Sequence, residues 1–256
     1  MHTADALFNG RLLLRQPEEG YRFSADAPLL VWFACGVSGG RVGCAVDLGA
    51  GCGVVALGLL AAGKAERAVA VEIQPALQAL CAANAQRNGF EQRLEAIRGD
   101  MRSAPLLEGR RFDLVAVNPP FWPADEGHLP DAEERRVACH EVSIDLDGWV
   151  ATAARLVERR RGRVCAVFPA RRAVELLAGL SRHGLGATRL LAVHPRPDAD
   201  AELVLVEARW GEKRPLALAA PIFLRDAANA DTAAARAIYS GEFSETLRAR
   251  PDRRLS

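Results

Sequence analysis

A glycine-rich turn between an apolar strand and an apolar helix constrains this fold more than any other feature. Residues 45–57 read AVDLGAGCGVVAL, so one apolar run enters the turn and a second one leaves it. Gly49, Gly51 and Gly53 allow the backbone to come close to a ligand, and the N-terminal amides of the following helix point at the same place. The pattern predicts a loop that binds a nucleoside-containing cofactor. Tight packing of the strand on the helix is the alternative explanation.

Strands and helices alternate along most of the chain. We predict strands near 43–48, 67–73, 94–99, 112–117, 162–168, 187–194 and 201–210, and helices near 25–36, 53–63, 75–88, 145–160 and 170–183. Such alternation predicts an α/β fold, a doubly wound and mostly parallel sheet with helices on both faces. Residues 194–200 are too short for a crossover helix, so we expect the last two strands to form an antiparallel hairpin.

Acidic residues end three successive predicted strands, at Asp47, Glu72 and Asp100. Glu72 is placed to accept hydrogen bonds from the two hydroxyls of a ribose, and Asp100 can accept one from an adenine amino group. Asp47 would repel a pyrophosphate but suits the cationic amino group of a methionine moiety. Although the loop also fits the loose dinucleotide pattern G-x-G-x-x-A, the acids favour S-adenosylmethionine. The cofactor-binding candidates from this part of the chain are Asp47, Gly49, Gly51, Gly53, Glu72, Ile73, Asp100 and Met101.

An Asn-Pro-Pro-Phe tetrapeptide follows the fourth predicted strand, at residues 118–121. Two prolines cannot donate backbone hydrogen bonds or continue a sheet, so the segment presents acceptors, the Asn118 side-chain oxygen and the Pro119 carbonyl. The ring of Phe121 adds a flat apolar surface. Two acceptors beside an aromatic ring suit a planar substrate that is held by its exocyclic amino group. We therefore predict that Asn118, Pro119, Pro120 and Phe121 are catalytic and that Asn118 also contacts the cofactor. A strand followed by a stiff turn is the alternative.

Both motifs resemble those of known enzymes. Residues 47–53 resemble the cofactor loop of class I methyltransferases, and residues 118–121 resemble the motif of amino-methyltransferases that modify adenine N6, cytosine N4, guanine N2 or a glutamine amide. Several further segments resemble the bacterial valine-tRNA adenine-37 N6-methyltransferase family. These are residues 8–12, 16–17, 20–30, 193–197 and 203–209, and the resemblance extends over about residues 6–225.

The resemblance implies a seven-stranded sheet with one reversed strand, S-adenosylmethionine as cofactor and methylation of an unpaired adenine next to a tRNA anticodon. It implies a methyltransferase domain at 43–225, preceded by a segment at 1–42 that closes over the cofactor and followed by a tail at 226–256. Within the first segment, Ser24 and Asp26 would lie near the methionine end of the cofactor, although they also suit the cap of a helix. We expect a cytoplasmic monomer.

Composition agrees with a soluble enzyme. Half of the residues are hydrophobic, yet no apolar run is long enough to span a membrane. The six cysteines show no C-x-x-C spacing, so we expect neither a metal site nor a disulfide set.

The net charge is only +1, but all basic residues except Lys64 and Lys213 are arginine, which suits phosphate contact. The arginines gather at Arg155, Arg159, Arg160, Arg161 and Arg163, at Arg171 and Arg172, and at Arg248, Arg250, Arg253 and Arg254.

Other functions compete with this interpretation. A methyltransferase for a protein glutamine amide would use the same tetrapeptide, as would one for DNA adenine or ribosomal RNA guanine. A small-molecule O-methyltransferase needs a base or a metal ion near the acceptor, and no carboxylate or histidine occupies position 118. A nucleotide-binding module without activity would have no use for Asn118.

Overall fold

The computed structural model describes residues 2–17, 25–36, 40–119 and 146–243. Their elements are β1 (His2–Leu7), β2 (Leu12–Pro17), α1 (Asp26–Gly36), β3 (Val42–Leu48), α2 (Val54–Ala61), β4 (Ala65–Glu72), α3 (Pro75–Arg87), β5 (Leu94–Arg98), η1 (Ala104–Leu107), β6 (Leu114–Val117), α5 (Leu146–Leu156), β7 (Arg163–Pro169), η2 (Ala170–Arg172), α6 (Ala173–Arg182), β8 (Leu185–His194), β9 (Leu203–Trp210), β10 (Ala217–Leu218), β11 (Ile222–Phe223) and α7 (Ala233–Ser240).

One mostly parallel sheet organises the molecule, in the order β10-β8-β9-β7-β6-β3-β4-β5. All seven predicted strands form, as β3 to β9, and the fold class is confirmed. β9 runs antiparallel to β8, as the short connection predicted, and it also runs antiparallel to β7. In the described part of the chain the sheet has nine strands rather than seven, because the two-residue strands β10 and β11 also pair with β8.

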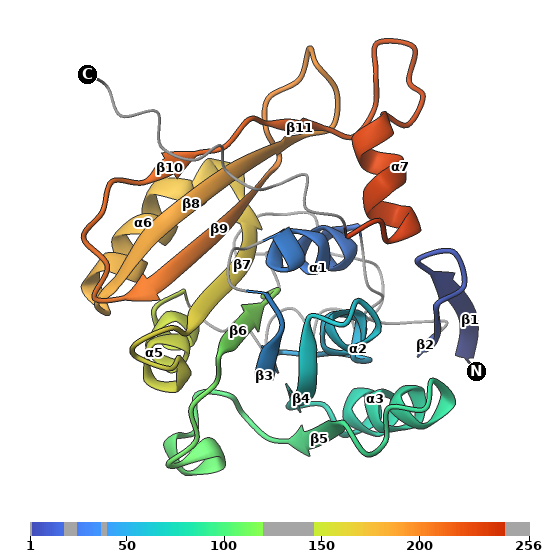
Figure 1. Ribbon diagram of the computed structural model, residues 1–256, viewed down its shortest axis with the longest axis vertical. Helices are drawn as coiled ribbons and strands as arrows, with labels where there is room; N and C mark the ends of the chain where they lie inside the picture. The colour runs from blue at the N-terminus through green and yellow to red at the C-terminus, as the bar shows by residue number, and fades with distance from the viewer. Residues whose placement is uncertain (1, 18–24, 37–39, 120–145, 244–256) are drawn as a thin grey trace, which may run out of the picture.

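Helices cover both faces of this sheet (Figure 1). Successive strand residues point to opposite faces, so Ala45 belongs to the core cluster under α1, α2 and α3, and Val46 to the cluster under α5 and α6. The central strands are therefore apolar on both sides, which is what a parallel sheet between two helical layers requires. No described helix is long and apolar enough to cross a membrane.

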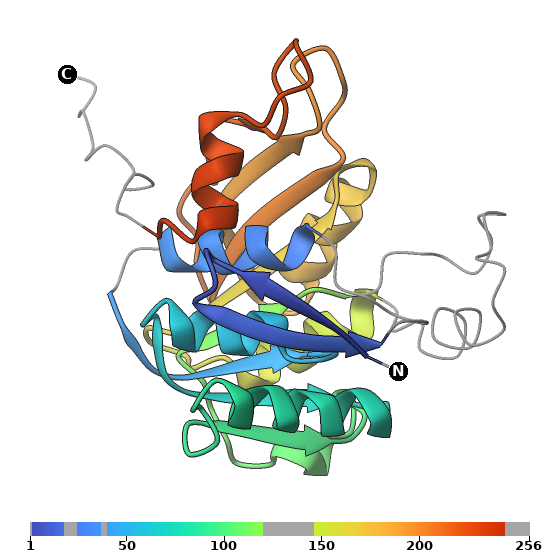
Figure 2. The same ribbon diagram turned by 90° about the vertical axis from the view of Figure 1, so that its right-hand side faces the viewer.

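The N-terminal residues form an antiparallel hairpin, β1 and β2, which was not predicted. Its tip uses Phe8, Asn9 and Gly10, all with positive φ. Phe8, Leu12 and Leu14 are buried in the core cluster of α1, α2 and α3. The hairpin lies on the outside of that helical layer (Figure 2), so residues before the first sheet strand are part of the fold. That they close over a cofactor stays a prediction, as do the domain limits.

Part of the C-terminal tail is helical, over Ala233–Ser240. The helix begins there because Thr232 is its N-cap and accepts a hydrogen bond from the Ala235 amide. The preceding residues form a turn in which Asp226 Oδ1 accepts hydrogen bonds from the amides of Ala228 and Ala230. Capping side chains, rather than alanine content, therefore set the start of α7.

Candidate active site

The strand ends bring the predicted site residues to one edge of the sheet. Val117 pairs with Leu48, Leu48 with Val71, and Glu72 with Arg98, so β6, β3, β4 and β5 end side by side. The residues that follow these ends are Gly49, Asn118 and, two positions after β5, Asp100. Asp47 and Glu72 lie in the last two positions of β3 and β4. Ligands of open α/β sheets bind at this edge.

The glycine turn has the backbone that the sequence predicted. Gly49, Gly51 and Gly53 have φ values of 78°, 56° and 92°, in the left-handed region that favours glycine. A Cβ atom on Gly53 would lie 2.6 Å from Cys81 Sγ, so the turn also packs closely on α3. The amides of Gly49 and Ala50 both donate to the Val71 carbonyl, at 2.9 and 3.0 Å. The turn is therefore fixed against the neighbouring strand and helix.

Asp47 is a buried carboxylate at the centre of the site, with 2% of its surface exposed. Its Oδ2 accepts a hydrogen bond from the Ala56 amide at 3.0 Å, in the first turn of α2. Burial raises the pKa of Asp47 to about 7, and the nearby Glu72 carboxylate adds to the rise. Among the described residues no lysine or arginine pairs with it. A buried carboxylate without a cationic partner is suited to hold a cationic ligand group.

Glu72 holds the glycine turn from the side of β4. Its Oε2 accepts a hydrogen bond from the Gly51 amide and its Oε1 one from the Gln74 amide, both at 2.8 Å. Burial raises the pKa of Glu72, while these two hydrogen bonds oppose the rise. Each carboxylate oxygen has a second lone pair. The Glu72 carboxylate can therefore still accept hydrogen bonds from ribose hydroxyls, and this contact stays a prediction.

Asp100 is more exposed and already has a partner. Arg102 Nη2 lies 2.7 Å from Asp100 Oδ2, and Arg102 Nε donates to Oδ1 at 3.0 Å. This hydrogen-bonded pair lowers the pKa of Asp100. Met101 is buried, and its Cε lies 3.1 Å from where a Cβ atom on Gly49 would be. Met101 thus packs under the turn. The Asp100 carboxylate would have to accept from Arg102 and from the adenine amino group at the same time if the predicted adenine contact forms.

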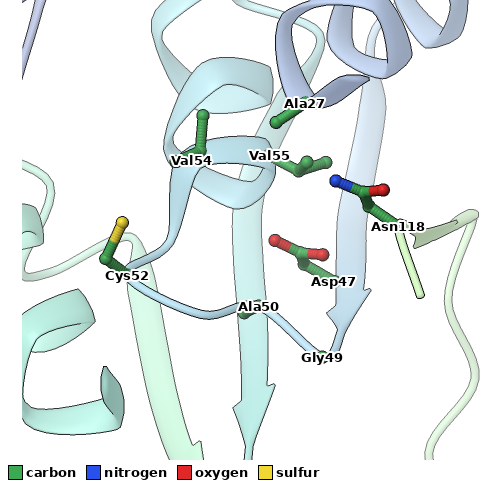
Figure 3. Close-up of a pocket in the computed structure, with 8 residues that line it drawn as sticks. All are labelled: Ala27, Asp47, Gly49, Ala50, Cys52, Val54, Val55 and Asn118. Atoms are coloured by element: carbon green, nitrogen blue, oxygen red, sulfur yellow. The ribbon is translucent and has the colours of Figure 1, made fainter. Parts of the chain in front are cut away.

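A small pocket of about 20 Å³ joins the two motifs. In Figure 3 the side chains of Asp47 and Asn118 point toward the same space from the ends of β3 and β6. Asn118 is 8% exposed, and no described residue forms a hydrogen bond with its side chain. The pocket has room for the end of a ligand rather than for a whole cofactor. It is lined by Ala27, Asp47, Gly49, Ala50, Cys52, Val54, Val55 and Asn118.

Of the predicted residues that the structure describes, three line this pocket: Asp47, Gly49 and Asn118. The other five lining residues were missed, because small apolar residues in a turn or an apolar helix carry no distinct sequence signal. Glu72, Ile73, Asp100 and Met101 lie at the same sheet edge but outside the pocket. Asp26 begins α1, where an acid suits the positive end of the helix dipole. Pro119 is buried directly after Asn118, while Ser24, Pro120 and Phe121 lie outside the described residues.

The arginine clusters lie on different edges of the sheet. Arg163 pairs with Leu114 at the beginning of β6, so residues 159–161 precede β7 on the edge opposite to Asn118. Arg159 stacks on the ring of Trp210 there, 3.2 Å from its centre. Arg171 and Arg172 instead follow the end of β7, on the same edge as the site. The first cluster is therefore poorly placed for contact with a substrate bound at the site. The arginines from 248 to 254 lie outside the described residues.

Comparison with known proteins agrees with this geometry. Residues 37–134 match the family model of the Methyltransferase small domain. A tRNA1(Val) (adenine(37)-N6)-methyltransferase from Porphyromonas gingivalis is 30% identical over 167 residues, which is 64% of each chain. The chain thus spans a little under two thirds of this relative. A release factor glutamine methyltransferase from Cereibacter sphaeroides is 33% identical over 172 residues, covering 64% of this chain and 58% of that protein.

The fold also matches solved structures. A predicted O-methyltransferase from Agrobacterium tumefaciens superimposes with a TM-score of 0.63 and 24% sequence identity. The match covers 84% of this chain and 96% of the other. At this identity the likeness concerns the arrangement of the sheet and helices.

Proposed function

We propose that this chain methylates N6 of an unpaired adenine in tRNA. The chain belongs to the class I S-adenosylmethionine-dependent methyltransferases and, within them, to the family of the tRNA1(Val) (adenine(37)-N6)-methyltransferases. The observation that carries the proposal is the position of Asn118. It stands at the end of β6 with its side chain in the same pocket as the buried Asp47 carboxylate. An acceptor for an amine and an acceptor for a cation thus share one small space.

The cofactor fits the residues of the glycine turn. Asp47, buried and without a cationic partner in the described part of the chain, would hold the amino group of the methionine moiety. Glu72 would accept from the ribose hydroxyls and Asp100 from the adenine amino group. No lysine or arginine lies in the turn at 47–53, in agreement with a cofactor that has no phosphate. When bound, S-adenosylmethionine supplies a methyl group on a positively charged sulfur.

The chemistry assigned to the tetrapeptide is positioning of the acceptor nitrogen. The lone pair of an adenine N6 is delocalised into the ring, which makes the nitrogen a poor nucleophile. Hydrogen bonds from its two hydrogens to the Asn118 oxygen and the Pro119 carbonyl would draw these hydrogens out of the ring plane and direct the lone pair away from the ring. Positioning and electrostatics then provide most of the lowering of the barrier. No general base is needed before attack, because the nitrogen becomes acidic only after methylation.

The adenine has to leave the base stack to reach such a pocket, and an adenine in an anticodon loop meets this condition at low cost. We propose that the enzyme acts as a monomer in the cytoplasm, and the tRNA-modifying relatives support this location.

A protein glutamine amide is the second candidate acceptor. The similarity to a release factor glutamine methyltransferase favours it, because an amide nitrogen is also planar and could be held by the same two acceptors. The two candidates differ in what surrounds the nitrogen rather than in the chemistry at position 118. An assay with each substrate therefore distinguishes the two candidates, whereas a mutation at position 118 would affect both reactions.

The test is an incubation of the purified protein with methyl-labelled S-adenosylmethionine and, separately, unmodified tRNA or a release factor. Mass spectrometry of the nucleosides should find N6-methyladenosine in tRNA. Label in a glutamine of the release factor, with none in tRNA, would overturn the proposed substrate and leave the family and the cofactor in place.

A further inference from the structure

A fully buried asparagine connects the N-terminal hairpin to the glycine turn. Asn84 lies in α3 and has 0% of its surface exposed. Its Nδ2 donates to the Cys52 carbonyl at 3.0 Å and to the Arg15 carbonyl at 2.9 Å, while its Oδ1 accepts from the Arg15 amide at 2.8 Å. Both donor hydrogens and the acceptor are therefore used. Asparagine is unfavourable inside a helix, so its place here depends on these contacts.

Asn84 and the residue one helical turn later hold β2 as a neighbouring strand would. Asn88 Oδ1 accepts from the Leu13 amide at 2.9 Å, and its Nδ2 donates to the Leu13 carbonyl at 2.8 Å. Each asparagine thus satisfies both backbone groups of one β2 residue, and these four hydrogen bonds attach the hairpin to α3 and its C-cap residue. The third contact differs, because Asn88 Nδ2 also donates to the Asn84 carbonyl, at the C-terminal end of α3.

The glycine turn is consequently held from two sides. On one side the Glu72 carboxylate accepts from the Gly51 amide. On the other side Asn84 donates to the carbonyl of Cys52, a residue that lines the pocket beside Asp47. Cys81, one turn earlier on α3, packs against Gly53. The residue after Cys52, Gly53, is the N-cap of α2 and has a left-handed conformation.

We propose that Asn84 is a positioning residue for the cofactor, which fixes the glycine turn through its hydrogen bond to the Cys52 carbonyl. This rests on the proposed binding of S-adenosylmethionine at the turn. Asn84 does not touch the pocket, so it acts through Cys52.

Asn88, the C-cap residue of α3, provides a matched control. Asn84→Ala and Asn88→Ala each remove two hydrogen bonds to β2, but only the first frees the Cys52 carbonyl. Leu12→Ala is a second control, because it removes a fully buried side chain from the hairpin and lowers stability without loss of a hydrogen bond to the turn. Thermal unfolding of all variants measures how far each one is destabilised.

The experiment is calorimetric titration of the full chain with S-adenosylhomocysteine, at a temperature well below the unfolding of every variant. We expect Asn84→Ala to bind S-adenosylhomocysteine about tenfold more weakly than the unmodified protein, a loss of ~1.4 kcal/mol of binding free energy. Both controls should bind it within about twofold of the unmodified protein, even where they unfold at a lower temperature. In the methylation assay KM for S-adenosylmethionine should rise in Asn84→Ala, while kcat at saturating cofactor stays nearly unchanged.

Asn84→Asp gives the same test if the alanine variant does not fold. It retains the volume and the acceptor for the Arg15 amide but has no donor for the Cys52 carbonyl, so weaker binding is again expected. Binding by an Asn84 variant within twofold of the unmodified protein would overturn the proposal. So would an equal loss of affinity in Asn88→Ala and Leu12→Ala, because affinity would then follow stability alone. Absence of binding to the unmodified protein would instead contradict the proposed function.

Discussion

Buried charges at the two edges of the sheet are satisfied in different ways. At the beginning of the strands, Arg163 Nε lies 3.0 Å from Glu207 Oε1, with side chains 14% and 9% exposed, and the buried Lys64 donates to the Gly40 carbonyl at 2.8 Å. At the carboxyl ends, Asp47 and Glu72 accept only from backbone amides among the described residues. One edge neutralises its charges internally. The other keeps two carboxylates that a ligand can contact, Asp47 through a cationic group and Glu72 through hydroxyl groups.

The largest expected effect comes from removing the acceptor at the carboxyl edge. Asn118→Ala should lower the rate of methyl transfer by about 100-fold or more, comparable to the loss of an oxyanion-hole donor. Affinity for S-adenosylhomocysteine should change only a few-fold, because Asn118 is assigned to the acceptor amine. Single-turnover assays with labelled cofactor and calorimetry measure the two quantities. Nearly normal turnover would show that the tetrapeptide is only a turn.

Breaking the ion pair at the opposite edge should affect stability alone. Arg163→Ala leaves the mostly buried Glu207 carboxylate without its partner, and we expect the free energy of unfolding to fall by about 3 kcal/mol. Chemical denaturation measures this loss. The double variant Arg163→Met with Glu207→Leu should recover much of it. Cofactor affinity should be unchanged in both, and a loss of affinity would show that the two edges are coupled.

Asp47 predicts a pH dependence at the carboxyl edge. Its pKa of about 7 in the folded protein is higher than the ~3.9 of an unfolded chain. Between these values the folded state binds more protons, so the free energy of unfolding of the ligand-free protein should fall as pH rises, and level off above pH 7.

A bound ammonium group favours the ionised carboxylate, so affinity for S-adenosylhomocysteine should rise with pH up to about 7, by at most about tenfold per unit. Asp47→Asn should weaken binding about tenfold at neutral pH and remove most of this dependence. Calorimetry at several pH values tests both statements. An unchanged pH profile in the variant would assign the ammonium group to another residue.

The smallest effect is expected from the arginines before β7. Reversing the charge of Arg159, Arg160 and Arg161 should change tRNA methylation by no more than about threefold, because they lie on the edge away from Asn118. The same change at Arg171 and Arg172 should weaken tRNA binding more and reduce its salt dependence. Filter binding at several salt concentrations compares the two variants. A stronger effect of the first cluster would mean that tRNA extends around the sheet.

The strands of the sheet could be predicted from the sequence because each one is marked by a local pattern of residues. Apolar runs with glycines and acids at their ends predicted β3 to β9 and brought Asp47, Glu72 and Asn118 to one edge. The position of Arg159 to Arg161 could also have been deduced, since they precede a strand parallel to β6. The hairpin and its asparagines could not be predicted. Arg15 and Asn84 are 69 positions apart, and their contact depends on how two elements pack.

The reversed strand has a consequence for synthesis of the protein. β9 lies between β7 and β8 but follows both in the sequence. A nascent chain that ends at His194 therefore contains β7 and β8 but not the strand that separates them. The backbone groups of β7 that later bond to β9 are then an unprotected strand edge, which favours pairing with other chains. The sheet closes only when residues 203–210 leave the ribosome, so aggregation during translation should be greatest just before that point.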